Sequence, residues 1–416
     1  MTGGRGQTSL PNGLRTLVPL KLKASVSGLP RLVWVLGAIS FLTSLGKMVA
    51  TFLAVYLLAV LNFSENQIGI TVAAYGAGIV TGTLIGGWAS ARLSAVAQMA
   101  ASMVCLGAGF ILLSAVASPL FFLAGIFACA NFEGALRTPI MLLFLKHCAP
   151  IDRPRAHAVY YTAIGLGYAV GSVIGGLVSR IDFSLMFWAS GGVYLAAAAA
   201  VLVWLPAHLA GGVAGMPGNA PATPEDANAP PKGRWPFIVL CGAAVLHHCV
   251  GNQRHAIYPL YLTSHYGLDT TQLGAIFAVN GLLIALMGLV TTNLLKHVDQ
   301  RKVAGWGTLL LCLSLALLPV STHIAVAFLL CVVMSVGDVL FAPSMVSLAY
   351  FLVLEKNKGK LLGVYFATVS ACRSLGPLIG IWGFALIGAT PTWLLCGVIG
   401  VVNMLVLRSV LRVRWP

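Results

Sequence analysis

Six charged side chains lie inside stretches of the sequence that are otherwise apolar. If such a stretch lies in a membrane, an isolated ionisable group there costs about 2.5 kcal/mol or more. A charge in that position is therefore expected to bind another charge, a ligand or a proton. Four of the six are cations and two are acids: Lys47, Arg137, Arg254, Arg373, Glu133 and Asp338.

The cations could recognise an anionic group. Arginine stays charged and offers a planar fork that matches a carboxylate or a phosphate. Arg373, with Ser370 and Ser374 close in sequence, is therefore the first candidate. We predict a substrate-binding set made of cations and of side chains that add hydrogen bonds: Lys47, Arg137, Arg254, Arg373, Tyr161, His248 and Asn280.

The two acids could carry protons. Glu133 and Arg137 are four residues apart, so they share one face of a helix and can form an ion pair. That pair could be structural or could tune a titrating carboxyl, because burial and a nearby arginine act on it in opposite directions. Asp338 takes a comparable place in the second half of the chain. For Asp338 we predict one of two roles. It either takes part in proton transfer or substrate binding, or it forms a structural ion pair with Arg373 or Lys47.

Three histidines follow one another in the segment HHCVGNQRH, from His247 to His255. Because histidine titrates near neutral pH, His247 joins Glu133 and Asp338 as a candidate for proton coupling. Gly251 and Pro259 can loosen this helix, as the broken helices of transporters require. No acid stands at a suitable ligand spacing, so no metal site is predicted.

The elements that hold these residues are membrane-spanning helices. The chain has 416 residues, 59% hydrophobic and 8% charged, whereas about 25% of the residues of a soluble domain are charged. The nine scattered cysteines include no CxxC pair and indicate neither a disulfide framework nor a zinc site. A spanning helix needs about 20 apolar residues. Twelve such runs are predicted, at 33–58, 67–90, 97–117, 119–145, 158–178, 184–206, 237–262, 270–295, 303–321, 323–352, 361–388 and 391–411.

The positively charged residues are unevenly distributed between the two sides of the predicted membrane. A net charge of +15 would suggest a nucleic-acid partner for a soluble chain. Here 20 of the 25 Lys and Arg residues fall in alternate connections between helices, and the opposite connections hold only Arg180. By the positive-inside rule, the termini (1–32 and 412–416) and the long connection 207–236 are predicted to be cytoplasmic. We therefore expect an inner-membrane protein in contact with lipid and without nucleic acid.

The chain also repeats internally. Residues 158–175, AVYYTAIGLGYAVGSVIG, align without gaps on residues 363–380, GVYFATVSACRSLGPLIG. Internal repeats in a membrane chain are typical of secondary transporters, in which the substrate site lies at the midplane between the repeats. The sequence thus predicts an all-α polytopic membrane protein made of two pseudo-symmetric six-helix bundles, 33–206 and 237–411.

Two motifs carry a resemblance to a known family. Residues 86–92, GGWASAR, join the second and third predicted helices. Residues 167–176 of the fifth helix read GYAVGSVIGG, with glycines at a spacing of four. With its helix count, the chain resembles the major facilitator superfamily, which has a G-x-x-x-D-R-x-G signature and an antiporter motif at these places. Ala91 replaces the aspartate and Ser94 the second glycine of the signature. The resemblance implies conformational roles for Gly87, Arg92, Gly167, Gly171, Gly175, Gly376, Pro377 and Gly380.

The resemblance further implies a cofactor-free, monomeric transporter that works by alternating access and is similar to the drug:proton antiporter branch. No Walker motif is present, so an ion gradient is the expected energy source. The net positive interior predicts an anionic or zwitterionic drug-like compound or metabolite, such as a siderophore, exported in exchange for protons. Proton-coupled uptake of an organic anion is the alternative, and a non-transporting membrane sensor is a remote one. HExxH and GxSxG patterns are absent, so no enzyme activity is expected.

Overall fold

The computed structural model describes residues 29–90, 92–148, 153–205, 234–294, 298–352 and 358–409. Residues 1–28, most of the predicted linker 207–236 and the C-terminal segment 412–416 lie outside these described ranges. Within them, twelve helical segments are long and apolar enough to cross a membrane. The prediction of an all-α polytopic fold with twelve spans is confirmed.

The N-terminal bundle contains six crossings. The first consists of α2 (Arg31–Leu45) and α3 (Met48–Ala59), which are separated by a short break. The other five are single helices: α4 (Glu65–Ser90), α5 (Ala95–Leu113), α6 (Pro119–His147), α7 (Arg153–Ile181) and α8 (Phe183–Trp204).

The C-terminal bundle has the same order, and its first crossing is also broken. That crossing consists of α9 (Arg234–Gly251), the 3-10 turn η4 (Asn252–His255) and α10 (Ile257–Ser264). The remaining elements are α11 (Thr270–Leu294), α12 (Gln300–Ala316) with the short η5 (Leu318–Val320), α13 (Ile324–Leu352), α14 (Lys358–Ile387) and α15 (Ala389–Ser409).

Both breaks lie beside residues that disfavour a regular helix. In the first crossing, Gly46 lies against the ring of Tyr194, and a Cβ there would be 2.7 Å from its Cε2 atom. Glycine also has a low helix propensity, so the helix ends easily at this point. In the seventh crossing, Ala256 takes φ −129° and ψ −87°, outside helical geometry, between Gly251 and Pro259. The predicted loosening of this helix is thus seen.

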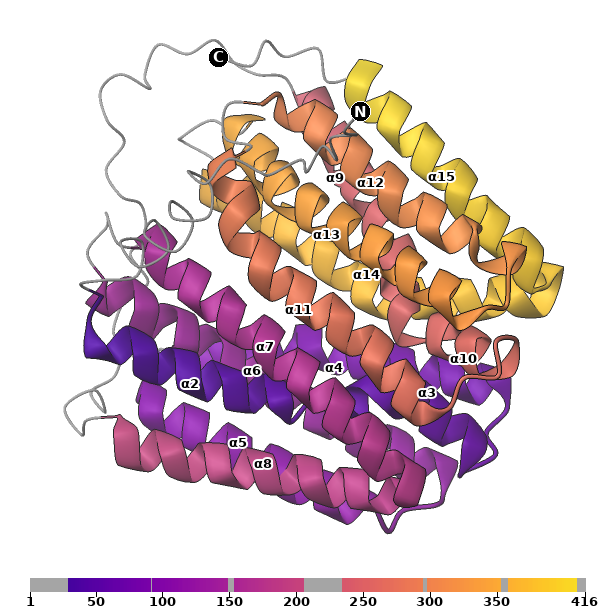
Figure 1. Ribbon diagram of the computed structural model, residues 1–416. Helices are drawn as coiled ribbons and strands as arrows, with labels where there is room; N and C mark the ends of the chain where they lie inside the picture. Colours follow the sequence, from indigo (N-terminus) through magenta and orange to yellow (C-terminus); the bar gives the residue numbers. More distant parts are fainter. Residues whose placement is uncertain are drawn as a thin grey trace, which may run out of the picture.

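The two bundles meet through faces of small residues. In Figure 1, α7 of the N-terminal bundle and α11 of the C-terminal bundle lie side by side across the middle of the molecule. A Cβ at Gly165 would lie 2.7 Å from the carbonyl oxygen of Gly281, and one at Gly176 would lie 2.5 Å from that of Thr270. Such small residues let helix backbones approach closely. Thr162 also donates a hydrogen bond to the carbonyl of Ala285, at 3.3 Å.

Contact between the bundles is concentrated toward one end of the molecule. There α3 packs against α10 and η4, and the first part of α4 packs against the last part of α14, with Gly69 against Ile381 and Gly76 against the backbone of Arg373. In the described residues, α2 and α9, which lead to the other end, have no comparable packing on each other. The bundles diverge toward that end (Figure 1). We call the two ends the closed end and the open end.

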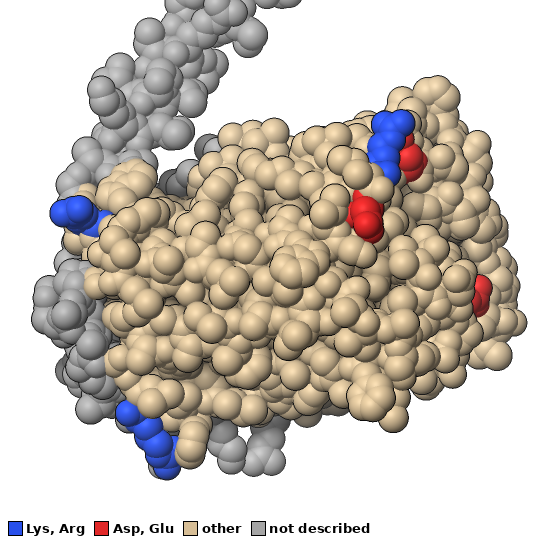
Figure 2. All heavy atoms as spheres, turned by 90° about the horizontal axis from the view of Figure 1, so that it is seen from below, with Lys and Arg blue, Asp and Glu red and all other residues tan. Residues whose placement is uncertain are grey.

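The outer surface suits a lipid bilayer. Figure 2 shows a face that is almost entirely uncharged, with Lys, Arg, Asp and Glu only near its two opposite edges. Large apolar side chains are exposed on the described helices, among them Leu84 (71%), Val203 (78%) and Leu386 (83%). A soluble monomer rarely exposes so extensive an apolar surface. With twelve spanning helices, this surface is the lipid-facing belt of a multi-pass membrane protein.

Candidate functional site

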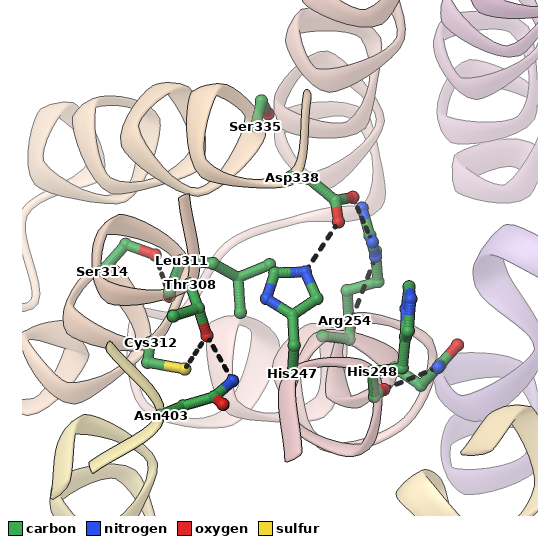
Figure 3. Close-up of polar contacts among 12 residues, drawn as sticks. His247, His248, Arg254, Thr308, Leu311, Cys312, Ser314, Ser335, Asp338 and Asn403 are labelled. Atoms are coloured by element: carbon green, nitrogen blue, oxygen red, sulfur yellow. Dashed lines mark hydrogen bonds and ion pairs between the residues drawn. The ribbon is translucent and has the colours of Figure 1, made fainter. Parts of the chain in front are cut away.

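In the C-terminal bundle, Asp338 of α13 is held by two basic side chains of the broken seventh crossing. Figure 3 shows its carboxylate between His247 and Arg254. Arg254 forms an ion pair with Oδ2, and the other oxygen, Oδ1, lies 3.4 Å from Nε2 of His247. The Nε atom of Arg254 donates to the carbonyl of Gly251 at 3.1 Å, which ties the guanidinium to the end of α9. The cluster therefore joins the break in the first helix of this bundle to its fourth helix.

His247 is the most deeply buried member of this cluster. Its side chain is 0% exposed, and its ring stacks on Phe341 with centroids 3.5 Å apart. The contact with Asp338 uses Nε2, and in the described part of the chain Nδ1 has no hydrogen-bond partner. Packing thus fixes the ring, and the ring in turn fixes one oxygen of Asp338.

In the N-terminal bundle, Glu133 of α6 occupies the corresponding place. Its Oε1 lies 3.0 Å from Nζ of Lys47, the residue at the break between α2 and α3. The hydroxyl of Tyr75 on α4 donates to its other oxygen. The Glu133 side chain is 9% exposed and that of Lys47 is 37% exposed, so this pair is open to the space between the bundles on its lysine side.

The two ion pairs differ from the pairs that the sequence predicted. Glu133 pairs with Lys47 and not with Arg137, and Asp338 pairs with Arg254 and not with Arg373 or Lys47. A pair at i and i+4 on one helix contributes only about 0.2–0.5 kcal/mol. A lysine from another helix together with a tyrosine hydroxyl can therefore displace it.

Arg137 and Arg373 remain without an acid. Both are exposed in the middle of long helices, and within the described residues neither forms an ion pair. They lie close enough to interact electrostatically with each other. Arg373 is also within electrostatic range of Glu133 and Arg254. Arg373 sits where the packing of α14 on α4 reaches Gly76, beyond which the bundles diverge. Two guanidinium groups without an acidic partner among the described residues, one from each bundle, thus lie within electrostatic range of each other.

The histidines of the seventh crossing lie at the edge of this space. His248 and His255 are partly exposed, and both are within electrostatic range of Arg373 and Arg254. His255 is also within range of Lys47 in the other bundle. Six of the predicted polar residues are therefore gathered between the bundles: Lys47, Glu133, Arg137, His248, Arg254 and Arg373.

Two other predicted substrate residues are placed differently. Asn280 is only 2% exposed and donates to the hydroxyl of Ser335 at 2.7 Å, so its amide joins α11 to α13 inside the C-terminal bundle. This position gives Asn280 no access to a ligand and argues against the predicted binding role. Tyr161 is 43% exposed and its ring contacts that of Tyr160, which is itself near Arg137.

The predicted glycine motifs pack on the two breaks. On α7, Gly167 faces the Phe41 carbonyl, and a Cβ at Gly171 would lie 2.5 Å from that of Leu45; Gly175 lies against Met48 and Phe52. On α14, a Cβ at Gly376 would lie 2.9 Å from the carbonyl of Cys249. In each bundle the fifth helix therefore supports the broken first helix through glycine, as the internal repeat requires.

Gln253, within η4, is a residue that the sequence analysis did not single out. Its amide nitrogen donates to the carbonyl of Gly376 at 2.7 Å and to that of Cys249 at 3.0 Å, and Gly380 leaves room for its side chain. On α14, Pro377 directly follows Gly376. Its position inside a predicted membrane helix, two residues after Gly251, could have marked this glutamine as a candidate.

The connection between α4 and α5 keeps part of the family signature. Arg92 lies over the ring of Trp88, 3.8 Å from its centroid, and nothing lies within 4 Å of a Cβ at Gly87. Behind them, the buried Gln98 donates to the carbonyls of Gly86 (2.9 Å) and Ala135 (3.1 Å). The Ser90 hydroxyl donates to the same glutamine. Hydrogen bonds between uncharged groups thus link α4, α5 and α6, near the position at which the family signature has an aspartate.

The described residues contain no group of three or more His, Cys, Asp or Glu side chains that could hold a metal ion. The groups gathered between the bundles are cations, a carboxylate, imidazoles and hydroxyls. These groups can bind an anion and exchange protons.

Comparisons with known proteins agree with this geometry. The model of the Major Facilitator Superfamily matches residues 36–250 and 255–414. The chain is 23% identical over 370 residues to a Na(+), Li(+), K(+)/H(+) antiporter of Planococcus maritimus, covering 80% of this chain and 83% of the relative. It is 24% identical over 230 residues to the uncharacterized MFS-type transporter YttB of Bacillus subtilis (strain 168), covering 54% of this chain and 56% of YttB. The latter match spans little more than half of the length of that relative.

A solved structure shows the same fold. The peptide transporter POT in complex with sulfate superposes with a TM-score of 0.78 at 16% sequence identity, covering 94% of this chain and 97% of that one. The family model covers most of the chain and leads to one conclusion. The chain belongs to the Major Facilitator Superfamily and is a multi-pass membrane transporter of the secondary type.

Proposed function

We propose that the protein exports a small anionic or zwitterionic organic molecule across the inner membrane in exchange for protons. The observation that carries the proposal is the pair Arg137 and Arg373. They come from different bundles, lie within electrostatic range of each other and have no acidic partner among the described residues. A carboxylate or phosphate between two guanidinium groups would accept charge-assisted hydrogen bonds from both.

Binding between the bundles also suits alternating access. An anion held by Arg137 of α6 and Arg373 of α14 links the two bundles, so its binding free energy depends on how far apart they are. With the termini on the cytoplasmic side, the open end would face the cytoplasm. The structure would then correspond to a state that collects cargo from inside the cell.

Glu133 is our candidate for the exchangeable proton. A zwitterionic cargo could place its carboxylate on the arginines and its ammonium group on Glu133, in the place that Lys47 occupies. A proton on Glu133 would remove the negative charge that holds the ammonium group. Proton and cargo would then exclude each other, which is the requirement for antiport. The name of the Planococcus maritimus relative and the glycines of α7 support the same direction.

One observation favours symport as a second candidate. When Glu133 takes up a proton, Lys47 loses its partner and adds a third free cation beside the arginines. A cargo with only negative charge would then bind together with the proton and would be taken up. The charge of the cargo thus decides between the two directions.

The test is transport in proteoliposomes. Purified protein should be reconstituted with an imposed pH gradient and offered a set of radiolabelled amino acids, carboxylates and phosphate esters. Cargo moving against the proton flow supports antiport, and cargo moving with it supports symport. Movement that ignores the gradient would refute proton coupling. Loss of all movement in Arg373→Gln but not in the distant Arg408→Gln would support the arginine site.

A further inference from the structure

Two cysteines that are far apart in sequence lie on the packed helices α9 and α14. Cys249 lies two residues before the end of α9, and Cys372 lies one turn before Gly376 on α14. The Cys372 sulfur is 3.9 Å from the carbonyl of Val245, one turn before Cys249 on α9. Cys372 thus packs one helical turn from Cys249, and the two thiols lie within electrostatic range of each other.

The close approach has a structural cause. At Gly376 the backbones of α9 and α14 come so near that an added Cβ would lie 2.9 Å from the carbonyl oxygen of Cys249. The two helices run in the same direction and stay in register, because Cys372 meets the turn of Val245 and Gly376 meets the turn of Cys249. The thiols are therefore held by two packed helices and do not depend on a loop.

The pair also borders the candidate site. Cys249 follows His248 and is partly exposed, whereas Cys372, which precedes Arg373, is buried. The other close pair of cysteines, Cys312 on α12 and Cys396 on α15, is buried on both sides. A reagent that enters the space between the bundles can thus reach the first pair through Cys249, whereas both thiols of the second pair are buried.

We propose that Cys249 and Cys372 form a dithiol site that chelates a thiophilic metalloid, trivalent arsenic in particular. Two thiols can bind one arsenic centre, and the second bond forms within the protein at a high effective concentration. With phenylarsine oxide the reaction is balanced without an oxidant. Two sulfur–arsenic bonds form, both thiol protons are lost, and the oxygen of the reagent leaves as water.

Chelation would also act on the transporter. The bridge joins the last turn of α9 to α14, directly before η4, where Gln253 already ties the two helices. A covalent link there would hold the break of the seventh crossing in one arrangement. We expect transport to be inhibited, but the chelation itself does not depend on the proposed cargo or on proton coupling.

The experiment uses the full-length protein in detergent, treated with phenylarsine oxide and measured by intact mass spectrometry. We expect one phenylarsenic group per chain with the loss of two hydrogens. The adduct should be removed by 2,3-dimercaptopropanol but not by 2-mercaptoethanol, since only a dithiol can compete with a chelate. Cys249→Ser and Cys372→Ser should each raise the concentration needed for half-labelling by at least about tenfold. The exposed Cys105 gives the matched control, and Cys105→Ser should label like the wild type.

A second measurement does not depend on the variants folding. Dibromobimane, which becomes fluorescent when it bridges two nearby thiols, should cross-link Cys249 and Cys372 in the wild-type chain, and peptide mapping should find both in one product. Arsenical binding that survives either substitution would overturn the proposal. So would a wild-type chain that takes up neither reagent.

Discussion

Lys47 and Glu133 form an ion pair of 3.0 Å that joins the break in the first membrane crossing to the fourth. Arg254 and Asp338 make the equivalent connection in the C-terminal bundle. The two pairs are alike in position and different in chemistry. The first has a lysine that is 37% exposed, whereas both side chains of the second are less than 20% exposed and the acid has a second basic neighbour in His247. We expect the first pair to open during transport and the second to hold the bundle together.

The first prediction concerns coupling. Glu133→Gln removes the carboxyl that we propose as the proton carrier and keeps a side chain of the same size. Transport driven by a pH gradient should fall to background in proteoliposomes, while exchange of labelled for unlabelled cargo at equal pH persists. The matched variant is Gln67→Glu at the exposed start of α4, which should leave both activities unchanged. Gradient-driven transport by Glu133→Gln would remove Glu133 from the mechanism.

The second prediction concerns stability. Asp338→Asn leaves Arg254 without its counter-charge in a largely buried position, and breaking a buried pair by removing one partner costs about 3–5 kcal/mol. Glu133→Gln should cost less, because the exposed side of Lys47 can be hydrated. Thermal unfolding in the same detergent should therefore show a larger drop in Tm for Asp338→Asn. Equal drops would mean that the two pairs are equivalent.

The helices and the charged interior could be predicted from the sequence, because long apolar runs and the cost of a buried charge depend only on local composition. The partners of those charges could not. The spacing of Glu133 and Arg137 is correct for a pair on one helix, but Lys47 reaches Glu133 because the first crossing breaks beside it. The break depends on Gly46 packing against Tyr194, a contact between residues far apart in sequence. In the same way, Cys249 and Cys372 are 123 positions apart and meet only through the packing of α9 on α14.

The third prediction concerns the support of the first break. In Gly171→Ala, the new methyl group would lie 2.5 Å from the carbonyl oxygen of Leu45, which is backbone and cannot move aside easily. Overpacking of this kind costs about 1–3 kcal/mol, so Tm should fall and the transport rate should decrease. Gly87→Ala is the control, since no atom lies within 4 Å of its Cβ. It should be neutral or slightly stabilising, because alanine is the better helix former. A neutral Gly171→Ala would contradict the close packing of α7 on the first crossing.

The fourth prediction concerns recognition. Arg373→Gln should weaken the binding of an anionic cargo by about tenfold to a hundredfold, in line with the about 1.5–3 kcal/mol that a hydrogen bond to a charged group contributes. Arg408→Gln makes the same change in charge at a distance from the site, since Arg408 lies over Trp306 at the end of α15. Isothermal titration with both variants separates a local effect from a change in overall charge. If both lose the same affinity, the arginine site is wrong.

The last prediction separates antiport from symport by the sign of a pH effect. A zwitterionic cargo needs the negative charge of Glu133 for its ammonium group, so its affinity should fall as the pH is lowered and Glu133 takes up a proton. A cargo with its amine acylated has only negative charge, and it should bind more tightly at the same low pH, because Lys47 is then free to attract it. The Kd of one amino acid and of its N-acetyl form should be measured over a pH range on the wild type and on Glu133→Gln. The two slopes should be opposite in the wild type, and both should flatten in the variant. Slopes of the same sign would show that Glu133 does not interact with the ammonium group of the cargo.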